Sequence, residues 1–153
     1  MSTSKYKKKA SNQAVADESG SNAAKIVRRA GHILSEEFLV SDDSAMIKAR
    51  MEEFLSGKDD VAVFVGGTGV SPDDLTVETV RPYLEKELEG FGEIFRAESY
   101  RKIGPSAFLS RATAGTTRGK LLVCLPGSPD AVITALRLFI GQFPTIILSA
   151  RNL

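Results

Sequence analysis

Cysteine and histidine each occur only once in this chain, as Cys124 and His32. A single cysteine excludes an internal disulfide and is typical of a protein from a reducing compartment. So few thiol and imidazole groups also argue against a zinc site and against a Cys–His catalytic pair. The net charge of +1 is too small to attract nucleic acid or an anionic lipid surface, so we expect neither partner.

Long apolar runs are missing as well. No uninterrupted run approaches the roughly 18 residues that a membrane-spanning helix needs. The start "MSTSKYKKKASNQ" lacks the apolar core of a secretory signal. The remaining composition is ordinary, since 42% of the 153 residues are hydrophobic and 25% are charged. These features predict one globular domain, located in the cytoplasm.

The order of apolar patterns predicts an α/β fold. We interpret residues 1–20 as a flexible polar lead and residues 21–153 as the domain. The four lysines among the first nine residues form either a solvated tail or an arm that contacts phosphate. Apolar residues recur at helical spacing around residues 23–30, 47–55, 77–88, 91–100 and 132–140, and short apolar strands are expected at residues 36–40, 61–65 and 121–125. This alternation predicts a three-layer α/β/α sandwich with a mostly parallel sheet.

Flexible and acidic residues follow the three predicted strands. Parallel strands direct their carboxyl ends to one edge of a sheet, where open α/β sheets bind ligands. The exits are Ser41, Asp42 and Asp43 after the first strand, Gly66, Gly67, Thr68, Gly69, Asp73 and Asp74 after the second, and Pro126, Gly127, Ser128 and Pro129 after the third.

These exits have the chemistry of a phosphate site with a metal ion. Glycines allow successive N–H groups to turn toward an anion, and Ser128 before Pro129 is a strong helix start whose N–H groups also attract phosphate. Asp42 and Asp74 could hold Mg²⁺, which binds carboxylates together with substrate phosphates and supports phosphoryl transfer.

Simpler interpretations remain open for each motif. "GGTG" is neither GxxxxGK[ST] nor GxGxxG, and glycine clusters after strands are usually tight turns. Asp42 and Asp43 could simply begin a helix, and Ser128 could be a helix cap and nothing more. Ser110 and Arg111 in "LSRATAG" either bind phosphate or are solvated.

Six segments together resemble the MoaB/Mog molybdopterin-binding family, in the same order and spacing. They are "DESG", "SDD", "GGTGVSPDDLTVE", "GFGEIFR", "GPSAFLSRATAG" and "LPGSP", and the resemblance runs from about Asp17 to the C-terminus. "GFGEIFR" and "GPSAFLSRA" are more similar to the MoaB branch.

The resemblance implies a three-layer α/β fold and an activity. The terminal phosphate of molybdopterin would attack the α-phosphorus of Mg·ATP and release pyrophosphate, giving the adenylylated pterin that later accepts molybdate or tungstate. By position, Asp42 and Asp74 match acids associated with metal and catalysis. The implied ligand-binding residues are Ser19, Gly20, Gly66, Gly67, Thr68, Gly69, Ser110, Gly127 and Ser128. Homotrimers or homohexamers, and contact with the molybdenum-insertion enzyme, are also implied.

Three departures from the family pattern stand out. Many relatives have a non-acidic residue at the place of Asp73, and many have proline where Val77 stands. The family also begins with an apolar parallel strand just before the segment that matches "STSKY". We expect either that the sequence starts too late to include this strand, or that another segment repairs the sheet.

Two other functions fit the same motifs. One is a non-catalytic molybdopterin carrier or scaffold of the MoaB branch. The other is a related domain, as found in larger molybdenum-insertion enzymes or in pyridine-nucleotide deamidases.

Overall fold

The elements form a four-stranded sheet between two layers of helices. The structure is a computed structural model, and it describes residues 17–153. The strands are β1 (Val61–Val65), β2 (Lys86–Glu87), β3 (Thr113–Thr117) and β4 (Lys120–Leu125). The helices are α2 (Glu18–Arg29), α3 (Ser44–Ser56), α4 (Thr76–Val80), α5 (Glu89–Ile103), α6 (Pro129–Phe139) and α7 (Phe143–Ala150), with 3-10 turns η1 (Arg81–Tyr83), η2 (Gly104–Leu109) and η3 (Ile140–Gln142).

The sheet has the strand order β1-β4-β3-β2. Strands β1 and β4 are parallel, whereas β3 is antiparallel to both β4 and β2. The α/β class and the three layers are therefore confirmed, but the sheet is mixed rather than mostly parallel. The antiparallel part arises because β4 follows β3 through a tight turn, in which Arg118 and Gly119 both have positive φ.

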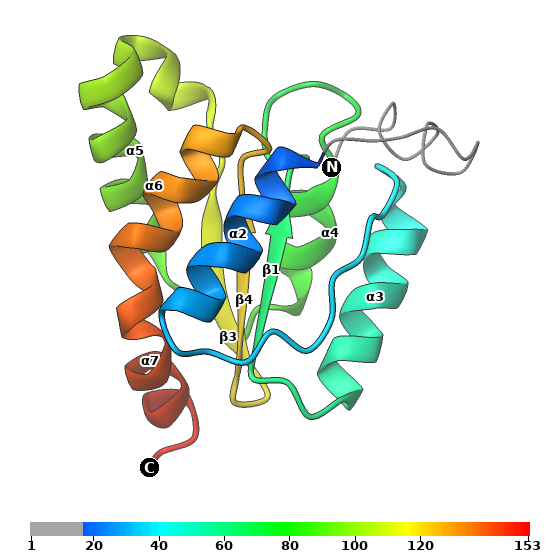
Figure 1. The fold of residues 1–153 in the computed structure, drawn as a ribbon. Coiled ribbons are helices and arrows are strands. Elements are labelled where there is room, and N and C mark those ends of the chain that lie inside the picture. The colour runs from blue at the N-terminus through cyan, green and yellow to red at the C-terminus, as the bar shows by residue number, and fades with distance from the viewer. Residues whose placement is uncertain (1–16) are drawn as a thin grey trace.

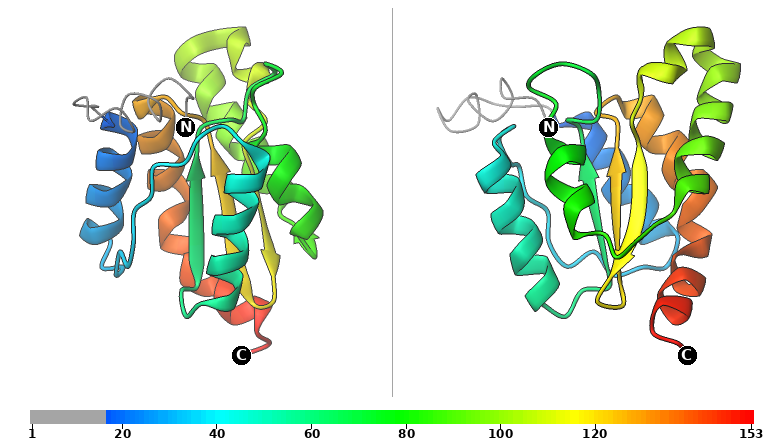
Figure 2. Two further views of the ribbon diagram at one scale, coloured as in Figure 1. Left: turned by 90° about the vertical axis from the view of Figure 1, so that its right-hand side faces the viewer. Right: turned by 180° about the vertical axis from the view of Figure 1, so that it is seen from behind.

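Strand β4 lies between two hydrophobic cores. Leu121, Val123 and Leu125 pack on one face with α2, α5, α6 and α7, while Leu122 and Cys124 pack on the other with α3 and α4. Figures 1 and 2 show these helices on the two faces of the sheet. This two-sided burial explains why β4 is apolar at successive positions. Burial also raises the pKa of the Cys124 thiol to about 12, so this cysteine is inert near neutral pH.

Two helix starts follow directly from their sequences. Ser128 caps α6 by accepting a hydrogen bond from Ala131 N at 3.3 Å, with Pro129 at the first helical position, as predicted. Asp17 caps α2 by accepting from Gly20 N at 3.1 Å. Helix α2 therefore begins at Glu18, and Ser19 and Gly20 lie in its first turn rather than in a flexible lead. The lysines of the lead lie outside the described residues.

The strand predicted at residues 36–40 is wrong, because this segment forms no regular structure. A strand needs a neighbour at about 4.8 Å, and here a cavity of about 1180 Å³ separates residues 33–41 from β1. Within residues 17–153, no segment pairs with the outer edge of β1.

The helix predicted over residues 77–88 is also shorter than expected. Helix α4 ends at Val80, and the chain continues through η1 into β2. Pro82 lies inside η1, where its ring and missing N–H stop an α-helix from continuing. In contrast, the short helix predicted over residues 91–100 is confirmed and extends over all of α5.

The stretch Pro129–Ala150 has the length and apolar composition of a helix that could cross a membrane. In the fold it consists of α6, η3 and α7. Val132, Leu136 and Ile147 of this stretch are buried in the core against the sheet, which accounts for its apolar character.

Candidate functional site

The candidate site is centred where β1 and β4 end side by side. Their parallel register pairs Val65 with Leu125, and Gly66 N then donates to Leu125 O at 2.8 Å. Both strands lead into loops at this point. A Cβ atom on Gly127 would lie 3.4 Å from the Gly66 Cα atom, so the two exit loops are in van der Waals contact.

The first turn of α2 joins the same place. Ser19 is 2% exposed, and its hydroxyl donates to Gly127 O at 2.6 Å. Figure 1 shows the N-terminal ends of α2 and α6 at the same end of the sheet as the loop after β1. Ser19, Gly66, Gly127 and Ser128 therefore meet, as expected for the two strand exits, while Ser19 was assigned to the site only through the family resemblance.

The loop after β1 presents backbone donors. Gly66 and Gly67 have φ values of 99° and 67°, which turn the chain sharply after the strand. Gly67 O accepts from Thr76 N at 3.0 Å, which ties the loop to α4. Within residues 17–153, the N–H groups of Gly67, Thr68 and Gly69 donate no hydrogen bond. Successive N–H groups of this kind form a concave binding surface for an anion.

Asp74 lies at the far end of this loop and stabilises it. Its Oδ2 atom accepts from Ser71 N at 2.9 Å, and its own N–H donates to Ser71 O at 2.9 Å. The same carboxylate lies beside Gly69, because a Cβ on Gly69 would be 2.6 Å from Oδ2. The Oδ1 atom makes no hydrogen bond with the described residues, so it can contact a ligand.

Arg111, two residues after the end of η2, holds this loop in place. Its N–H donates to Thr68 O at 3.0 Å, and its guanidinium donates to Gly69 O at 2.7 Å and to Asp74 O at 3.3 Å. It also forms an ion pair with Glu78. The hydrogen bond from Arg111 lowers the pKa of Glu78, and the same bond raises the pKa of Arg111. Both sequence interpretations of Arg111 missed this role, because the partners of its guanidinium lie 33 to 42 residues away in the sequence.

Ser110 directly precedes Arg111 but faces a second cavity. Its hydroxyl accepts from Ala112 N at 3.3 Å, and its carbonyl accepts from Arg96 at 3.3 Å. It lines a second cavity of about 460 Å³ together with Arg96 and Arg111. Ser110 is thus connected to the site through Arg111, not through a contact with the glycine loops.

Asp42 precedes Asp43, whose side chain caps α3 by accepting from Ala45 N at 2.7 Å. The N-terminal end of α3 lies at the same end of the molecule as the glycine loop (Figure 1). Among residues 17–153, no group of three or more histidine, cysteine or acidic side chains could hold a metal ion. A cation here would therefore need oxygen atoms from a bound phosphate in addition to Asp42 and Asp74.

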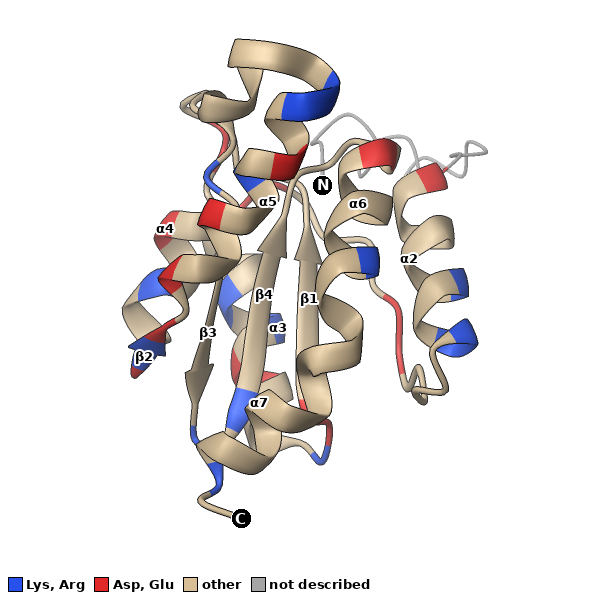
Figure 3. Ribbon diagram, turned by 90° about the vertical axis from the view of Figure 1, so that its left-hand side faces the viewer, with Lys and Arg blue, Asp and Glu red and all other residues tan. Residues whose placement is uncertain are grey.

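The charges around the helix starts are mixed. Figure 3 shows acidic residues at the first turns of α2 and α6, which are Glu18 and Asp130. Acidic side chains stabilise these positive helix ends. Asp130 also lies 3.5 Å from Lys102 of α5, so its charge is partly balanced within the fold.

The chain matches a family of known proteins over most of its length. A model of the family described as "Probable molybdopterin binding domain" matches residues 2–145. Molybdenum cofactor biosynthesis protein B of Staphylococcus aureus (strain Mu50) is 46% identical over 99 residues, which are 64% of this chain and 59% of that protein. The chain therefore spans about three fifths of the length of that relative. A protein of Methanocaldococcus jannaschii named probable molybdopterin adenylyltransferase is 42% identical over 117 residues, or 72% of each chain.

Solved structures share the fold. A crystal structure of molybdenum cofactor biosynthesis protein B has a TM-score of 0.85 and 36% identity, covering 90% of this chain and 87% of the other. The tungsten cofactor synthesizing protein MoaB from Pyrococcus furiosus has a TM-score of 0.82 and 35% identity, covering 94% of this chain and 91% of the other.

We predict that Gly67→Ala destabilises the loop. Positive φ costs a residue with a Cβ about 1–2 kcal/mol, and the new methyl group would also meet the Thr76 hydroxyl. Urea denaturation should show this loss. Gly90→Ala in α5 is the matched control, because no atom lies within 4 Å of the new methyl group. Equal stabilities of the two variants would contradict the assigned loop conformation.

We predict a pH-dependent effect of Glu78→Gln. Folding lowers the pKa of Glu78 below 4.5, so the folded state binds fewer protons than the unfolded state at acidic pH. The ion pair therefore stabilises the fold at pH values above 4.5, the ordinary pKa of the group, and its contribution is lost as pH falls through the lower pKa of the folded state. Because the pair is partly exposed, we expect Glu78→Gln to cost on the order of 1 kcal/mol or less at pH 7.

Denaturation of both proteins at several pH values checks this. The difference between Glu78→Gln and wild type should shrink toward pH 3. Glu93→Gln is the control, since Glu93 is exposed and forms no ion pair with the described residues. A difference that is constant from pH 7 to pH 3 would rule out the ion pair as its cause.

Proposed function

Because the chain belongs to the molybdopterin-binding family that matches residues 2–145, we propose that it acts in molybdenum cofactor biosynthesis as a molybdopterin adenylyltransferase. The name of the Methanocaldococcus jannaschii relative supports this activity. The proposed substrates are molybdopterin and ATP, with Mg²⁺ as cofactor.

One observation carries the proposal: the unbonded N–H groups of Gly67, Thr68 and Gly69 lie beside the contact between the two strand exits. Such donors suit a phosphate, and both proposed substrates carry phosphate. The adjoining turns add the Ser128 hydroxyl and the N-termini of helices α2 and α6, while the buried Ser19 hydroxyl holds Gly127 in place. We infer that a phosphate of the pterin or of ATP is bound by this loop.

The reaction is a displacement at phosphorus. An oxygen of the terminal phosphate of molybdopterin forms a bond to the α-phosphorus of ATP. The bond from that phosphorus to the bridging oxygen breaks, and its electrons leave with pyrophosphate. The loop amides hold and orient the phosphates, which is the main contribution a protein makes to this chemistry.

Asp42 and Asp74 are the proposed Mg²⁺ ligands. Asp74 fits this role, since its Oδ1 atom makes no hydrogen bond with the described residues while Oδ2 keeps the carboxylate in place. When bound, Mg²⁺ would offset the negative charge of the reacting phosphates.

A binding-only role is the second candidate. The Ser71–Asp74 hydrogen bonds show that Asp74 also has a structural use, so its presence alone does not require catalysis. A carrier would bind molybdopterin through the same glycine loops but would not form the adenylylated product.

We also propose a homo-oligomer, a trimer or a hexamer. At the C-terminal end of α5 and in turn η2, Tyr100, Ile103 and Phe108 are each more than half accessible to solvent, and Leu109 is partly exposed. Apolar side chains that cluster in this way mark interaction surfaces. We place the protein in the cytoplasm, with the molybdenum-insertion enzyme as the consumer of its product. Cell fractionation and co-purification with that enzyme would check both points.

The central test is Asp74→Asn, with purified protein, molybdopterin, ATP and Mg²⁺. Asparagine keeps the hydrogen bond to Ser71 N but removes the charge that a metal needs. Loss of metal stabilisation worth several kcal/mol should lower turnover by at least about 100-fold. Binding of molybdopterin, followed by fluorescence, should be retained.

Asp73→Asn is the matched control, because this neighbouring acid is exposed and its carboxylate accepts no hydrogen bond from the described residues. It should keep most of the activity. Wild-type turnover in Asp74→Asn would refute the role of Asp74. Tight pterin binding by a wild-type protein that forms no product would establish the carrier instead.

We predict that Phe108→Glu weakens the oligomer. A charge placed in the apolar surface of α5 and η2 must be desolvated when copies associate. Sedimentation velocity should show smaller particles for Phe108→Glu than for the wild type. Leu148→Glu on α7 is the control, since this leucine is also about half accessible to solvent but lies outside that surface. A monomeric wild type would contradict the proposal.

A further inference from the structure

A single peptide unit connects Arg96 of α5 with the glycine loop. On one side of this unit, the Ser110 carbonyl accepts a hydrogen bond from Arg96 Nη1 at 3.3 Å. On the other side, the Arg111 N–H of the same unit donates to Thr68 O at 3.0 Å. Because a trans peptide directs its C=O and its N–H to opposite sides, the two bonds together fix the orientation of its plane. Arg96 therefore helps to set the direction from which the loop is held.

The next peptide unit continues the connection to the ligand side. Thr68 O shares its unit with the Gly69 N–H, which donates to no acceptor in the part of the chain that the structure describes. This N–H points away from Arg111 and is available to an anion. Hydrogen bonds in a chain polarise one another, so a chain that begins at a cation strengthens the donor at its far end. Two peptide units thus join the Arg96 guanidinium to one donor of the glycine loop.

Helix α5 makes room for this contact at Gly92, about one helical turn before Arg96. Side chains on a helix lean toward its N-terminus, so the Arg96 guanidinium lies over position 92. A Cβ atom on Gly92 would be 2.7 Å from Arg96 Nη2 and 2.7 Å from Ala112 O. Glycine in a helix interior usually lowers stability relative to alanine. Its presence here is explained by the space that the guanidinium and the start of β3 require.

The charge of Arg96 is directed at backbone carbonyls rather than at a carboxylate. Among residues 17–153, Arg96 forms no ion pair, and its Nη1 atom also donates to Ala112 O at 3.3 Å. By contrast, Arg81 of the same cavity is paired with Glu87. A guanidinium without a paired carboxylate keeps its full charge, so it polarises the carbonyls that it contacts more strongly.

We propose that Arg96 is a positioning residue of the glycine loop. It acts through two peptide units, those of Ser110–Arg111 and of Thr68–Gly69, and it strengthens the Gly69 N–H as a donor to an anionic ligand. Arg96 itself does not touch the ligand. The inference deepens the proposed function, because it rests on the binding of a substrate phosphate by this loop.

The first test uses the isotope-labelled, ligand-free protein. Arg96→Ala should shift the amide signals of Arg111 and Gly69, because the first loses its fixed plane and the second its polarisation. Arg101→Ala is the matched control, since Arg101 lies on the same helix but is exposed and pairs with Glu98. It should leave both signals in place. An unchanged Gly69 signal in Arg96→Ala would overturn the proposal.

Free guanidinium ion should repair the connection in Arg96→Ala. The second cavity borders Gly92, Ser110 and Ala112, so an ion added at millimolar concentration can enter the space that the side chain leaves. It should return the Arg111 and Gly69 signals toward their wild-type positions. Tetramethylammonium carries the same charge but has no N–H donor, so it should not. Equal responses to the two ions would rule out a hydrogen-bonded connection.

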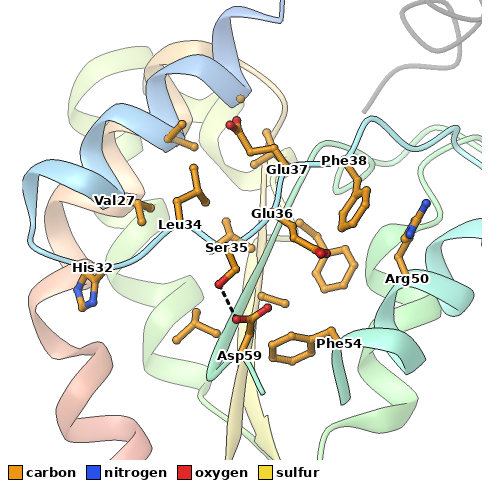
Figure 4. A pocket seen from close by; sticks show the side chains of 18 of the residues that line it. Val27, His32, Leu34, Ser35, Glu36, Glu37, Phe38, Arg50, Phe54 and Asp59 are labelled. Carbon is orange, nitrogen blue, oxygen red and sulfur yellow. Dashed lines mark hydrogen bonds between the residues drawn. The ribbon is translucent and has the colours of Figure 1, made fainter. Parts of the chain in front are cut away.

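The larger cavity, between β1 and residues 33–41, provides an internal control for this rescue. Figure 4 shows Glu36, Phe38 and Asp59 on its walls, which are side chains that attract a cation. Guanidinium that binds there shifts amides of residues 33–41 in the wild type and in Arg96→Ala alike. Rescue at the second cavity shifts Arg111 and Gly69 in the variant alone.

Molybdopterin binding measures the effect on the candidate site. Arg96→Ala should bind molybdopterin about tenfold more weakly, as the loss of one hydrogen bond to a charged group allows, and guanidinium should restore the affinity. Gly92→Ala should weaken binding similarly, because its methyl group displaces the guanidinium. Gly90→Ala, with no atom within 4 Å of the new methyl group, should bind as the wild type does.

A second pair of variants covers the case in which Arg96→Ala does not fold. Lysine and methionine are similar in length, but only lysine keeps a charged donor. Arg96→Lys should retain most of the molybdopterin affinity and Arg96→Met should lose it. Equal affinities of these two folded variants would overturn the proposal.

The readouts separate this inference from the proposed activity. A wild type that binds molybdopterin but forms no adenylylated product would refute the activity and leave the role of Arg96 intact. A weaker affinity of Arg96→Ala that guanidinium does not reverse would refute the role of Arg96, whatever the turnover of the wild type.

Discussion

The parallel pairing of β1 with β4 determines where the candidate site lies. It aligns Val65 with Leu125, so the two strands end at the same level. The hydrogen bond from Gly66 N to Leu125 O then extends the pairing by one residue and brings the two exit loops into contact. A shift of register by even one residue would reverse the faces of β4, burying different side chains and separating the loops.

The cost of this arrangement is a loop whose backbone groups are poorly satisfied internally. Three successive N–H groups have no acceptor within the described residues, so the loop needs support from elsewhere. Arg111 supplies it by holding the carbonyl groups of Thr68, Gly69 and Asp74, while Glu78 holds Arg111. Because a trans peptide directs its N–H opposite to its carbonyl, the bond from Arg111 N to Thr68 O turns the Gly69 N–H away from Arg111. In this way an ion pair that adds little to global stability positions the candidate site.

Features that depend on local chemistry could be predicted from the sequence. Ser128 followed by Pro129 identifies a helix start, and the uninterrupted apolar runs at residues 61–65 and 121–125 identify strands covered on both faces. The convergence of Gly66 and Gly127 followed from the expectation that the strands are parallel, which holds for β1 and β4, whereas Ser19 was assigned to the site only through the family resemblance.

Features that depend on distant partners could not be predicted in this way. Residues 36–40 have a strand-like composition, but the edge of β1 is too far away to pair with them. Strand β3 is composed of small and polar residues, and its strand form depends on pairing with β4 through the tight turn at Gly119. Arg111 looked like a solvated or phosphate-binding residue because no local pattern reveals carbonyl acceptors that lie dozens of positions earlier.

The most direct measurement is an amide chemical-shift titration of the isotope-labelled protein with molybdopterin. We expect the amides of Ser19, Gly67, Thr68 and Gly127 to shift together and to saturate at one ligand concentration, since they surround one phosphate-binding surface. Shifts confined to the second cavity around Arg96 and Ser110, with no change at Gly67 and Gly127, would contradict it.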